Sequence, residues 1–386
     1  MKLIHLGDLH LGRSLLDFDL IPDQSYILDR IIQLALEHQA DAVIIAGDVY
    51  DRPVPSEAAV NLFDSFLCRL AEQGTHTFII SGNHDSDDRL NFGSSLFRSS
   101  RIYIASKYRG ELFHHVLQDG YGDVHVYLLP FVKASQVRHY LPDEDIVSCD
   151  GAVRALIRHA GINPGERNII AAHQFVTGVS GSHPETGGSE GMAVLQVGLV
   201  EEIGYSCFES FDYAALGHLH KGQKVGRDGV RYSGSPLKYS LSEAGSSKSV
   251  PLITLGAKGD VSVELLPLKP LRDLRHLRGT RSQLLDPSHI TDPDDFIYVT
   301  LTDEDFLQDA MGIFRQYYPN TVRIDYDNSH TRDIVMTETG ELSERRSFEE
   351  LISDFYSRIY GEEISEEELE MMKQAAGEAG VIHETD

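Results

Sequence analysis

Five apolar segments of the chain end in residues that could bind a metal ion. The segments LIHLGDLH, VIIAGD, FIISGNHD, NIIAAH and YAALGHLH run from aliphatic residues directly into Asp, Asn or His. Their endings supply Asp8, His10, Asp48, Asn83, His173, His218 and His220. A mixed oxygen and nitrogen set without thiolate suits manganese, iron or zinc better than magnesium or calcium. Because seven groups are too many for one tetrahedral ion, they predict two divalent ions that share a carboxylate.

The spacing within these endings indicates how strands would bring the groups together. Residues i and i+2 point to the same side of an extended chain, so Asp8 pairs with His10 and His218 pairs with His220. Functional groups of α/β sheets gather at the carboxyl ends of the strands. A solitary Asp at a strand end is more often a turn residue, and a solitary His more often a core group. Five such endings in one chain favour a shared site.

The elements that must position these groups alternate along the first half of the chain. Residues 26–39 and 152–161 have helical periodicity, and Ser56 is the expected N-cap of a helix over 58–73. From about residue 223 the pattern changes to short strands joined by turns that contain Gly and Asp. This order predicts an α/β fold in which helices flank two packed sheets.

The last third of the chain has a different organisation. Residues 296–326 are expected to form a strand, a helix and a strand within a small unit. Capping boxes at Ser347 and Glu350, and at Ser365 and Glu368, predict two short helices near the end of the chain. Two short helices cannot make a core of their own, so they pack either on the body of the protein or on a partner.

Composition narrows the class of protein. The net charge is −26 over 386 residues, which argues against a diffuse basic surface that grips nucleic acid unaided. Three widely separated cysteines, Cys68, Cys149 and Cys207, are expected to be reduced structural thiols. Asp8 and His10 follow so soon after Met1 that no basic-then-apolar leader precedes the first motif. No apolar stretch is long enough to span a bilayer, so we expect a cytoplasmic protein.

The five endings together resemble the five motifs of the calcineurin-like metallophosphoesterase superfamily. The resemblance implies a four-layer αββα fold of two packed mixed sheets flanked by helices. Later segments, among them FDYAALGHLHKGQ, YSGSPLKYSLSE and KPLRDLR, are similar to those of the nuclease subunits of bacterial SbcC–SbcD complexes. That family implies a nuclease domain over residues 1–270, a small α+β capping domain over 271–335 and a C-terminal helix-loop-helix over 336–386.

The resemblance also implies a division of the metal ligands. One ion would be bound by Asp8, His10 and His220, and the other by Asn83, His173 and His218. Asp48 would bridge the two ions. Manganese is the metal that the family implies.

Two further residues have implied catalytic roles. His84 would be a general acid, or a hydrogen-bond donor, for the leaving oxygen. Asp51 would orient the imidazole of His84, although an Asp at this place is equally consistent with a plain turn residue. Arg52 is a weaker candidate for a contact with phosphate, because an Arg at the start of a loop is more often simply solvated.

The function implied by the family is a double-strand DNA exonuclease and single-strand or hairpin endonuclease. Its partners would be DNA, an SbcC-type SMC-like ATPase docked on the C-terminal helices, and a second copy of the chain. It would act at the nucleoid in DNA repair, recombination and replication, with no membrane partner. One alternative is a small-molecule phosphodiesterase or phosphatase of the same fold. The other is a scaffold that binds no metal.

Overall fold

The computed structural model describes residues 1–186, 202–329, 352–353, 356, 364–365 and 368–373. The chain forms two compact units. The first comprises Met1–Arg278, Leu284–Val299 and Asp309–Ile324, and the second comprises Gly279–Gln283, Thr300–Gln308 and the described part of Asp325–Asp386. Within the described residues, no helix combines the length and the hydropathy that a membrane crossing requires.

The first six-stranded sheet has the order β16-β15-β1-β4-β5-β6. Its strands are β1 (Lys2–Leu6), β4 (Ala42–Ala46), β5 (His76–Ile80), β6 (Ile102–Ala105), β15 (Ser249–Leu255) and β16 (Val261–Pro267). Strands β1, β4, β5 and β6 are parallel, whereas β15 runs antiparallel to β1 and to β16. Three of the five predicted strand endings therefore belong to neighbouring parallel strands.

The second six-stranded sheet has the order β13-β14-β12-β9-β8-β7. Its strands are β7 (Phe113–Asp119), β8 (Gly122–Leu129), β9 (Arg167–His173), β12 (Tyr213–Gly217), β13 (Gln223–Val225) and β14 (Arg227–Tyr232). Strands β8, β9, β12 and β14 are parallel, and β7 and β13 pair antiparallel at the edges. The other two strand endings, those of β9 and β12, are neighbours in this sheet.

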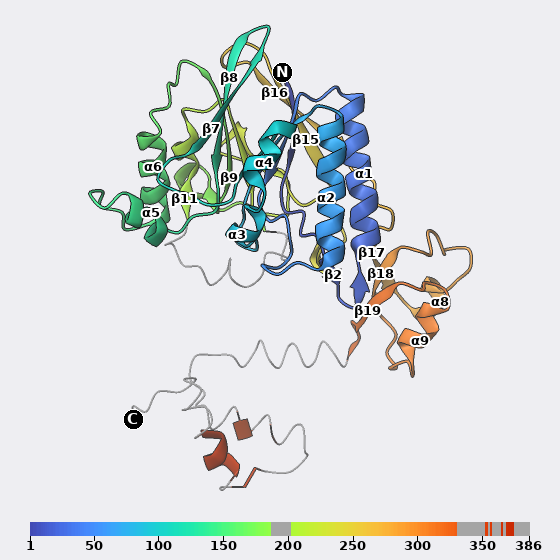
Figure 1. Ribbon diagram of the computed structural model, residues 1–386. Coiled ribbons are helices and arrows are strands. Elements are labelled where there is room, and N and C mark those ends of the chain that lie inside the picture. Colours follow the sequence, from blue (N-terminus) through green and yellow to red (C-terminus); the bar gives the residue numbers. More distant parts are fainter. Residues whose placement is uncertain (187–201, 330–351, 354–355, 357–363, 366–367, 374–386) are drawn as a thin grey trace. The chain divides into compact units, whose positions relative to one another are not determined.

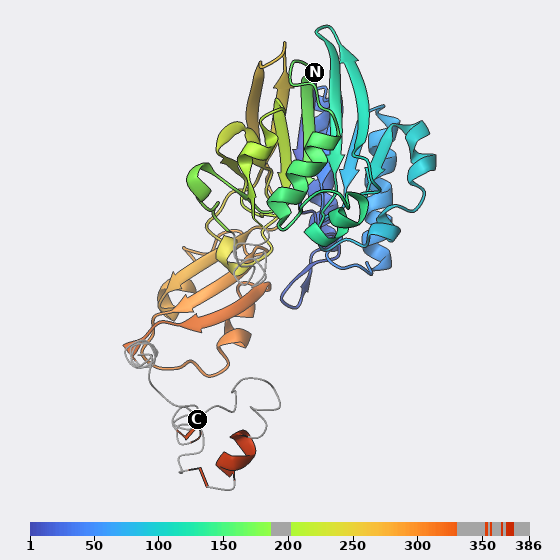
Figure 2. The ribbon, with the colours of Figure 1, turned by 90° about the vertical axis from the view of Figure 1, so that its left-hand side faces the viewer.

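Apolar side chains fill three layers around the two sheets. One cluster draws on both sheets and includes Ile44, Phe78 and Ala171. The longest helices, α1 (Ile21–Glu37) and α2 (Glu57–Glu72), pack on the first sheet, and α6 (Cys149–His159) packs on the second. Figure 1 shows α1 and α2 side by side, with α6 on the opposite side of the strands, and Figure 2 shows the same layers from the α6 side. The predicted αββα arrangement of two mixed sheets is confirmed.

Local sequence signals explain the ends of two of these helices. The Ser56 hydroxyl accepts a hydrogen bond from the Ala59 amide at 3.3 Å, as expected of an N-cap. Helix α1 begins at Ile21, five residues before the predicted helix, because a proline is tolerated in the first turn. Short elements connect the main ones: β2 (Ser14–Leu15), β3 (Phe18–Asp19), α3 (Asp87–Leu90), α4 (Ser94–Phe97), η1 (Arg98–Ser100), α5 (Ala134–Tyr140), β10 (Val176–Thr177), η2 (Val179–Gly181), β11 (Ile203–Gly204), η3 (Tyr205–Phe208) and η4 (Leu241–Glu243).

A three-stranded sheet follows the two six-stranded sheets along the chain. Its order is β17 (Leu274–Gly279), β18 (Phe296–Leu301) and β19 (Thr321–Tyr326), with α8 (Arg281–Leu284) and α9 (Ala310–Arg315) between the strands. The predicted strand, helix and strand over 296–326 are present. Ser365 and Glu368 exchange the hydrogen bonds of a capping box. Ser347, Glu350 and most of the first predicted C-terminal helix lie outside the described residues, so the domain boundaries and the docking role remain predictions.

Candidate metal centre

The five predicted strand endings converge where the two sheets meet. Asp8, Asp48 and Asn83 follow β1, β4 and β5, while His173 is the last residue of β9 and His218 follows β12. Gly217 pairs with His173 across the second sheet, so the ends of β9 and β12 are level. Side-chain contacts join residues that follow strands of the first sheet, such as His10 and Asn83, to His220 and His173 of the second sheet. All seven predicted ligands thus lie in one site.

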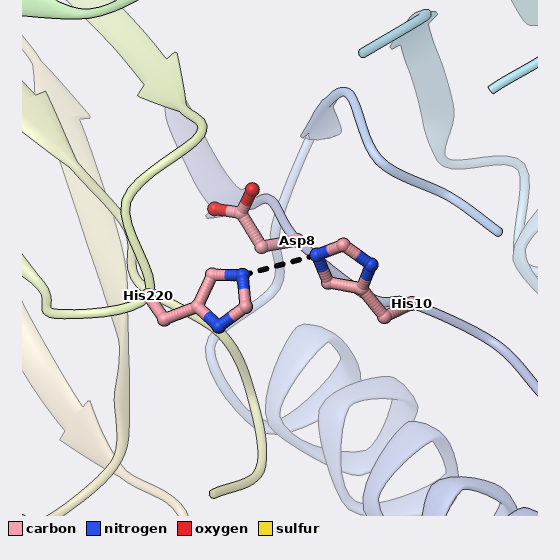
Figure 3. Close-up of side chains that lie close together, drawn as sticks. All are labelled: Asp8, His10 and His220. Carbon is pink, nitrogen blue, oxygen red and sulfur yellow. Dashed lines mark hydrogen bonds between the residues drawn. The ribbon is translucent and has the colours of Figure 1, made fainter. Parts of the chain in front are cut away.

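The first group of ligand atoms comes from Asp8, His10 and His220. One donor atom from each lies within 4.8 Å of the others. Figure 3 shows the two imidazoles facing each other beside the Asp8 carboxylate, with Nε2 of His10 3.0 Å from Nε2 of His220. The main-chain amide of His218 donates to Asp8 Oδ1 at 2.8 Å. Asp8 Oδ2 is buried and has no hydrogen-bond partner within the described residues, which leaves it available to a cation.

Asp48 lies between the first group and a second one. Its Oδ2 is 3.6 Å from His10 Nε2 and 3.4 Å from His173 Nε2. Donor atoms of Asp8, Asp48 and His173 also lie within 4.8 Å of one another. This is the place that a shared carboxylate would occupy between two ions.

Asn83 completes the second group. Its Oδ1 is 3.1 Å from His173 Nε2 and 3.0 Å from His218 Nδ1. The other nitrogen of His173, Nδ1, lies 2.8 Å from the carbonyl oxygen of Ala46 and donates to it. A main-chain acceptor at this position fixes the ring and directs Nε2 toward Asn83 and Asp48, where a metal ion would bind.

The two sides of the site differ in exposure. Asp8, His10, His173 and His220 are buried. Asn83 is exposed, and His84 and His218 are partly exposed. The site is therefore open to solvent on the side of Asn83, His84 and His218.

Four of the predicted ligands have left-handed backbone conformations. The φ angles are 54° at Asp8, 43° at His10, 49° at Asp48 and 103° at His218. Such conformations are costly for residues with a side chain and persist where the surrounding structure imposes them. Here the Asp8 and His10 amides donate to the Gly47 and Asp48 carbonyls at 3.1 and 3.0 Å. Hydrogen bonds between the β1 and β4 loops therefore hold the ligands in place.

Glycine precedes most of the ligands because the site leaves no room for a Cβ atom. At Gly82 a Cβ would lie 2.1 Å from Asp48 Oδ1, and at Gly217 it would lie 1.9 Å from the Ala46 carbonyl oxygen. Both distances are far below van der Waals contact. The GN and GH dipeptides of the motifs thus permit the close approach of main chain and ligands.

Asp85 is a supporting residue that sequence reasoning missed. Its buried carboxylate accepts hydrogen bonds from the amides of Val49, Tyr50 and Gly82 at 3.1, 2.9 and 2.9 Å. It thereby ties the β4 loop to the β5 loop. Burial, followed by the charge of Asp48, raises the pKa of Asp85 to about 7. Its place directly after His84 in the GNHD motif was the available signal.

His84 and Asp51 are in contact through the main chain of Asp51. His84 Nδ1 lies 3.0 Å from the main-chain carbonyl oxygen of Asp51 rather than on its carboxylate. That carboxylate lies 3.6 Å from His10 Nδ1 and 3.2 Å from the guanidinium of Arg13. The carbonyl can hold the His84 ring, while the carboxylate supports His10. The Arg52 side chain is 81% exposed, in keeping with a solvated Arg.

Burial and mutual charges shift the pKa values of three of the candidate ligands. Burial raises the pKa of Asp8 to about 6. Burial opposes ionisation of Asp48 too, but His173 and His10 hold its pKa well below the usual value. Burial alone would lower the pKa of His173, yet the charge of Asp48 raises it to about 9. Since the unpaired Asp8 oxygen and the converging imidazoles form a donor set for cations, the residues fit two divalent ions.

These pKa values predict a pH dependence of metal binding. In the protein without bound metal, the His173 imidazole is positively charged below about pH 9, and the Asp8 carboxyl group is protonated below about pH 6. Because ligands must be deprotonated, each must lose its proton when an ion binds. We expect manganese affinity to rise between pH 6 and 9 and protons to be released, as measured by titration calorimetry in buffers of different ionisation enthalpy. An affinity that stays constant over this range would contradict the assigned ligands.

Comparison with known proteins agrees with this geometry. A family model described as calcineurin-like phosphoesterase matches residues 1–222, which is more than half of the chain. The chain belongs to the calcineurin-like phosphoesterase family. With its cluster of Asp and His side chains, this calcineurin-like chain is a metal-dependent phosphoesterase-type hydrolase whose site suggests two divalent metal ions.

Two further similarities extend the comparison. Residues 270–360 match the SbcD C-terminal model, described as the type 5 capsule protein repressor C-terminal domain. Among solved structures, the calcineurin-like fold is similar to that of a dimetal phosphatase from Danio rerio, with 12% sequence identity and a TM-score of 0.39. The match covers 70% of this chain and 98% of the phosphatase chain.

Proposed function

We propose that the chain is the nuclease subunit of an SbcC–SbcD-type complex and hydrolyses DNA phosphodiesters with two divalent ions. The observation that carries the proposal is the presence, in one chain, of a calcineurin-like phosphoesterase match over residues 1–222 and an SbcD C-terminal match over 270–360. A phosphoesterase that acts on a small molecule has no need of the second segment. The combination of the two matches, and not the phosphoesterase fold alone, supports the proposed nuclease function.

The proposed metal ligands are divided between two ions. Asp8, His10 and His220 would hold one ion, Asn83, His173 and His218 would hold the other, and the Asp48 carboxylate would be available to both. Ions bound in this way neutralise charge on the phosphoryl group and lower the pKa of water for in-line displacement. The buried carboxylates of Asp8 and Asp48 do not repel the substrate once cations are bound, because the local charge is then set by the ions.

His84 acts on the leaving oxygen in this proposal. Its Nδ1 donates to the Asp51 carbonyl at 3.0 Å, which leaves Nε2 for the substrate. Its ring lies edge-on to that of His10, with 4.9 Å between centroids, so it borders the first metal group. Asp51 contributes through its main chain to His84 and through its carboxylate to His10.

The charge of the chain explains why the proposal includes a partner. With a net charge of −26, the isolated subunit has little long-range attraction for DNA. An SbcC-type ATPase supplies that grip, and residues 336–386 are its proposed docking segment. The proposed nuclease domain comprises residues 1–270, and the proposed capping domain comprises residues 271–335. The proposed metal is manganese. The proposed assembly is a homodimer that acts at the nucleoid in DNA repair, recombination and replication.

Cleavage of end-labelled linear duplex tests the function. We expect shortening of the duplex in manganese when an SbcC-type ATPase and ATP are present, and much less with the chain alone. Asp48→Asn is the control, since it removes the proposed shared carboxylate and should abolish cleavage. Hydrolysis of bis-nitrophenyl phosphate with an intact duplex under every condition would instead indicate a small-molecule enzyme. Metal analysis that finds no bound ion would indicate the scaffold alternative.

A further inference from the structure

A buried ion pair lies beside His220, one of the proposed ligands. Glu243, at the end of η4, and Lys248 have side chains that are only 4% and 9% exposed. The Lys248 ammonium is 2.5 Å from Glu243 Oε2. Both residues belong to the SLSEAGSSK segment, which begins within the YSGSPLKYSLSE segment.

The pair contacts both the main chain and the ring of His220. Lys248 Nζ donates to the His220 carbonyl oxygen at 2.9 Å and to Ser235 Oγ at 2.8 Å. Glu243 Oε1 is 3.8 Å from His220 Nδ1 and accepts a hydrogen bond from the Tyr239 amide at 3.3 Å. The ammonium thus holds the loop that carries His220, and the carboxylate faces its imidazole.

The two nitrogens of His220 face different surroundings. Nε2 lies 3.0 Å from His10 Nε2, in the group that includes Asp8 (Figure 3). Nδ1 faces the Glu243 carboxylate. A negative charge on that side favours the tautomer with its proton on Nδ1, which leaves the lone pair of Nε2 for a metal ion. Outer carboxylates commonly orient metal-binding histidines in this way and raise their basicity.

A purely structural role would not account for this arrangement as well. Replacing a buried ion pair by apolar residues of similar volume is often neutral or stabilising, so the pair is weak evidence for stability. The pair instead contacts one proposed ligand, His220, through both its ring and its main chain. We propose that Glu243 and Lys248 are positioning residues that set the affinity of the ion held by Asp8, His10 and His220. The proposal rests on the proposed metal centre but not on DNA being the substrate.

Metal binding by full-length variants tests this role. Metal-depleted wild type, Glu243→Gln, Lys248→Met and the double variant are titrated with manganese by calorimetry, and free manganese is followed by electron paramagnetic resonance. For Glu243→Gln we expect one of two ions to bind ~10–100-fold more weakly, the usual cost of losing an outer partner, while the other ion is retained. The readout is binding stoichiometry and affinity, so it does not depend on catalysis.

Unfolding by urea separates positioning from folding. Lys248→Met leaves the Glu243 carboxylate buried without its cation, so it should lower the unfolding midpoint more than the charge-free double variant does. The double variant should regain stability but keep the weakened metal site. Asp212→Asn is the matched control: this 3% exposed carboxylate pairs with Lys258 at 2.9 Å and belongs to none of the metal groups. It should lose stability and keep wild-type affinity for both ions.

The possible failures are distinguishable. Unchanged manganese affinity in Glu243→Gln, or restored affinity in the double variant, would overturn the positioning role and leave the metal centre intact. Equal weakening of both ions would also overturn it. A wild-type chain that binds fewer than two ions would contradict the metal centre itself, and the role of Glu243 with it.

Discussion

Replacing His84 by alanine should lower the rate of phosphodiester hydrolysis by ~10²–10⁴-fold, the usual contribution of a positioned acid or base. The variant should still bind two ions, because the His84 side chain belongs to neither of the two groups that contain Asp8 and His220 or Asp48 and His173. Its amide, which donates to Asp48 Oδ1 at 2.9 Å, remains in the variant. Steady-state kinetics and metal analysis of the same preparation would measure both quantities.

A substrate series and a control variant make this result specific. If His84 assists the leaving group, the defect should shrink for esters with good leaving groups such as nitrophenolate, which need little protonation. His139→Ala, an exposed histidine on α5, should behave as wild type. Loss of an ion from His84→Ala would show that the residue is a ligand, through the His10, Asp51 and His84 group, and would refute the assigned role.

Replacing Gly217 by alanine should disable the site altogether. The new Cβ would lie 1.9 Å from the Ala46 carbonyl oxygen and 2.8 Å from His173 Nδ1, where it would disrupt the hydrogen bond between them. Since neither atom is at the end of a flexible side chain, β4 and β12 must move apart. We expect destabilisation of about 3 kcal/mol, at the upper end for overpacking, together with loss of tight metal binding.

Gly120 offers the matched control for that substitution. A Cβ at Gly120 would meet no atom within 4 Å. Gly120→Ala should therefore change the free energy of unfolding by only about 0.5 kcal/mol and leave metal affinity unchanged. Urea unfolding and manganese titration of the two variants would test the pair. A stable Gly217→Ala protein with two bound ions would show that the strand ends tolerate separation.

Much of the fold, and the convergence of the candidate ligands on one site, was readable from the sequence for a simple physical reason. An apolar run that stops at Asp48 or His173 marks both a buried strand and the side chain at its end, and parallel strands place such ends together. The Ser56 cap was readable because a serine directly before a segment of helical periodicity is well placed to accept a hydrogen bond from a free amide of the first turn. The early start of α1 was missed because a proline in the first turn has the same appearance as a break before the helix.

Residues that act on main-chain groups were harder to find. Asp85 binds three amides from two different loops, and Glu243 faces a histidine that precedes it by more than twenty positions. Neither spacing follows a strand or helix period, and only the position of Asp85 directly after His84 offered a local signal. The contact of His84 with a carbonyl oxygen, and not with the Asp51 carboxylate, depends on the path of the β4 loop. Such details are set by tertiary structure.

The hydrogen bond from His173 to Ala46, which joins one sheet to the other, has a consequence for the order of biosynthesis. The ligands of each proposed ion span both sheets, so neither ion has its full set until the chain has been made at least as far as His218. A site of this kind rarely exists in an unfolded chain. A nascent polypeptide would therefore emerge from the ribosome with little power to capture whichever cation is most abundant. Metal selection would fall to the folded protein, where cavity size and donor geometry can discriminate.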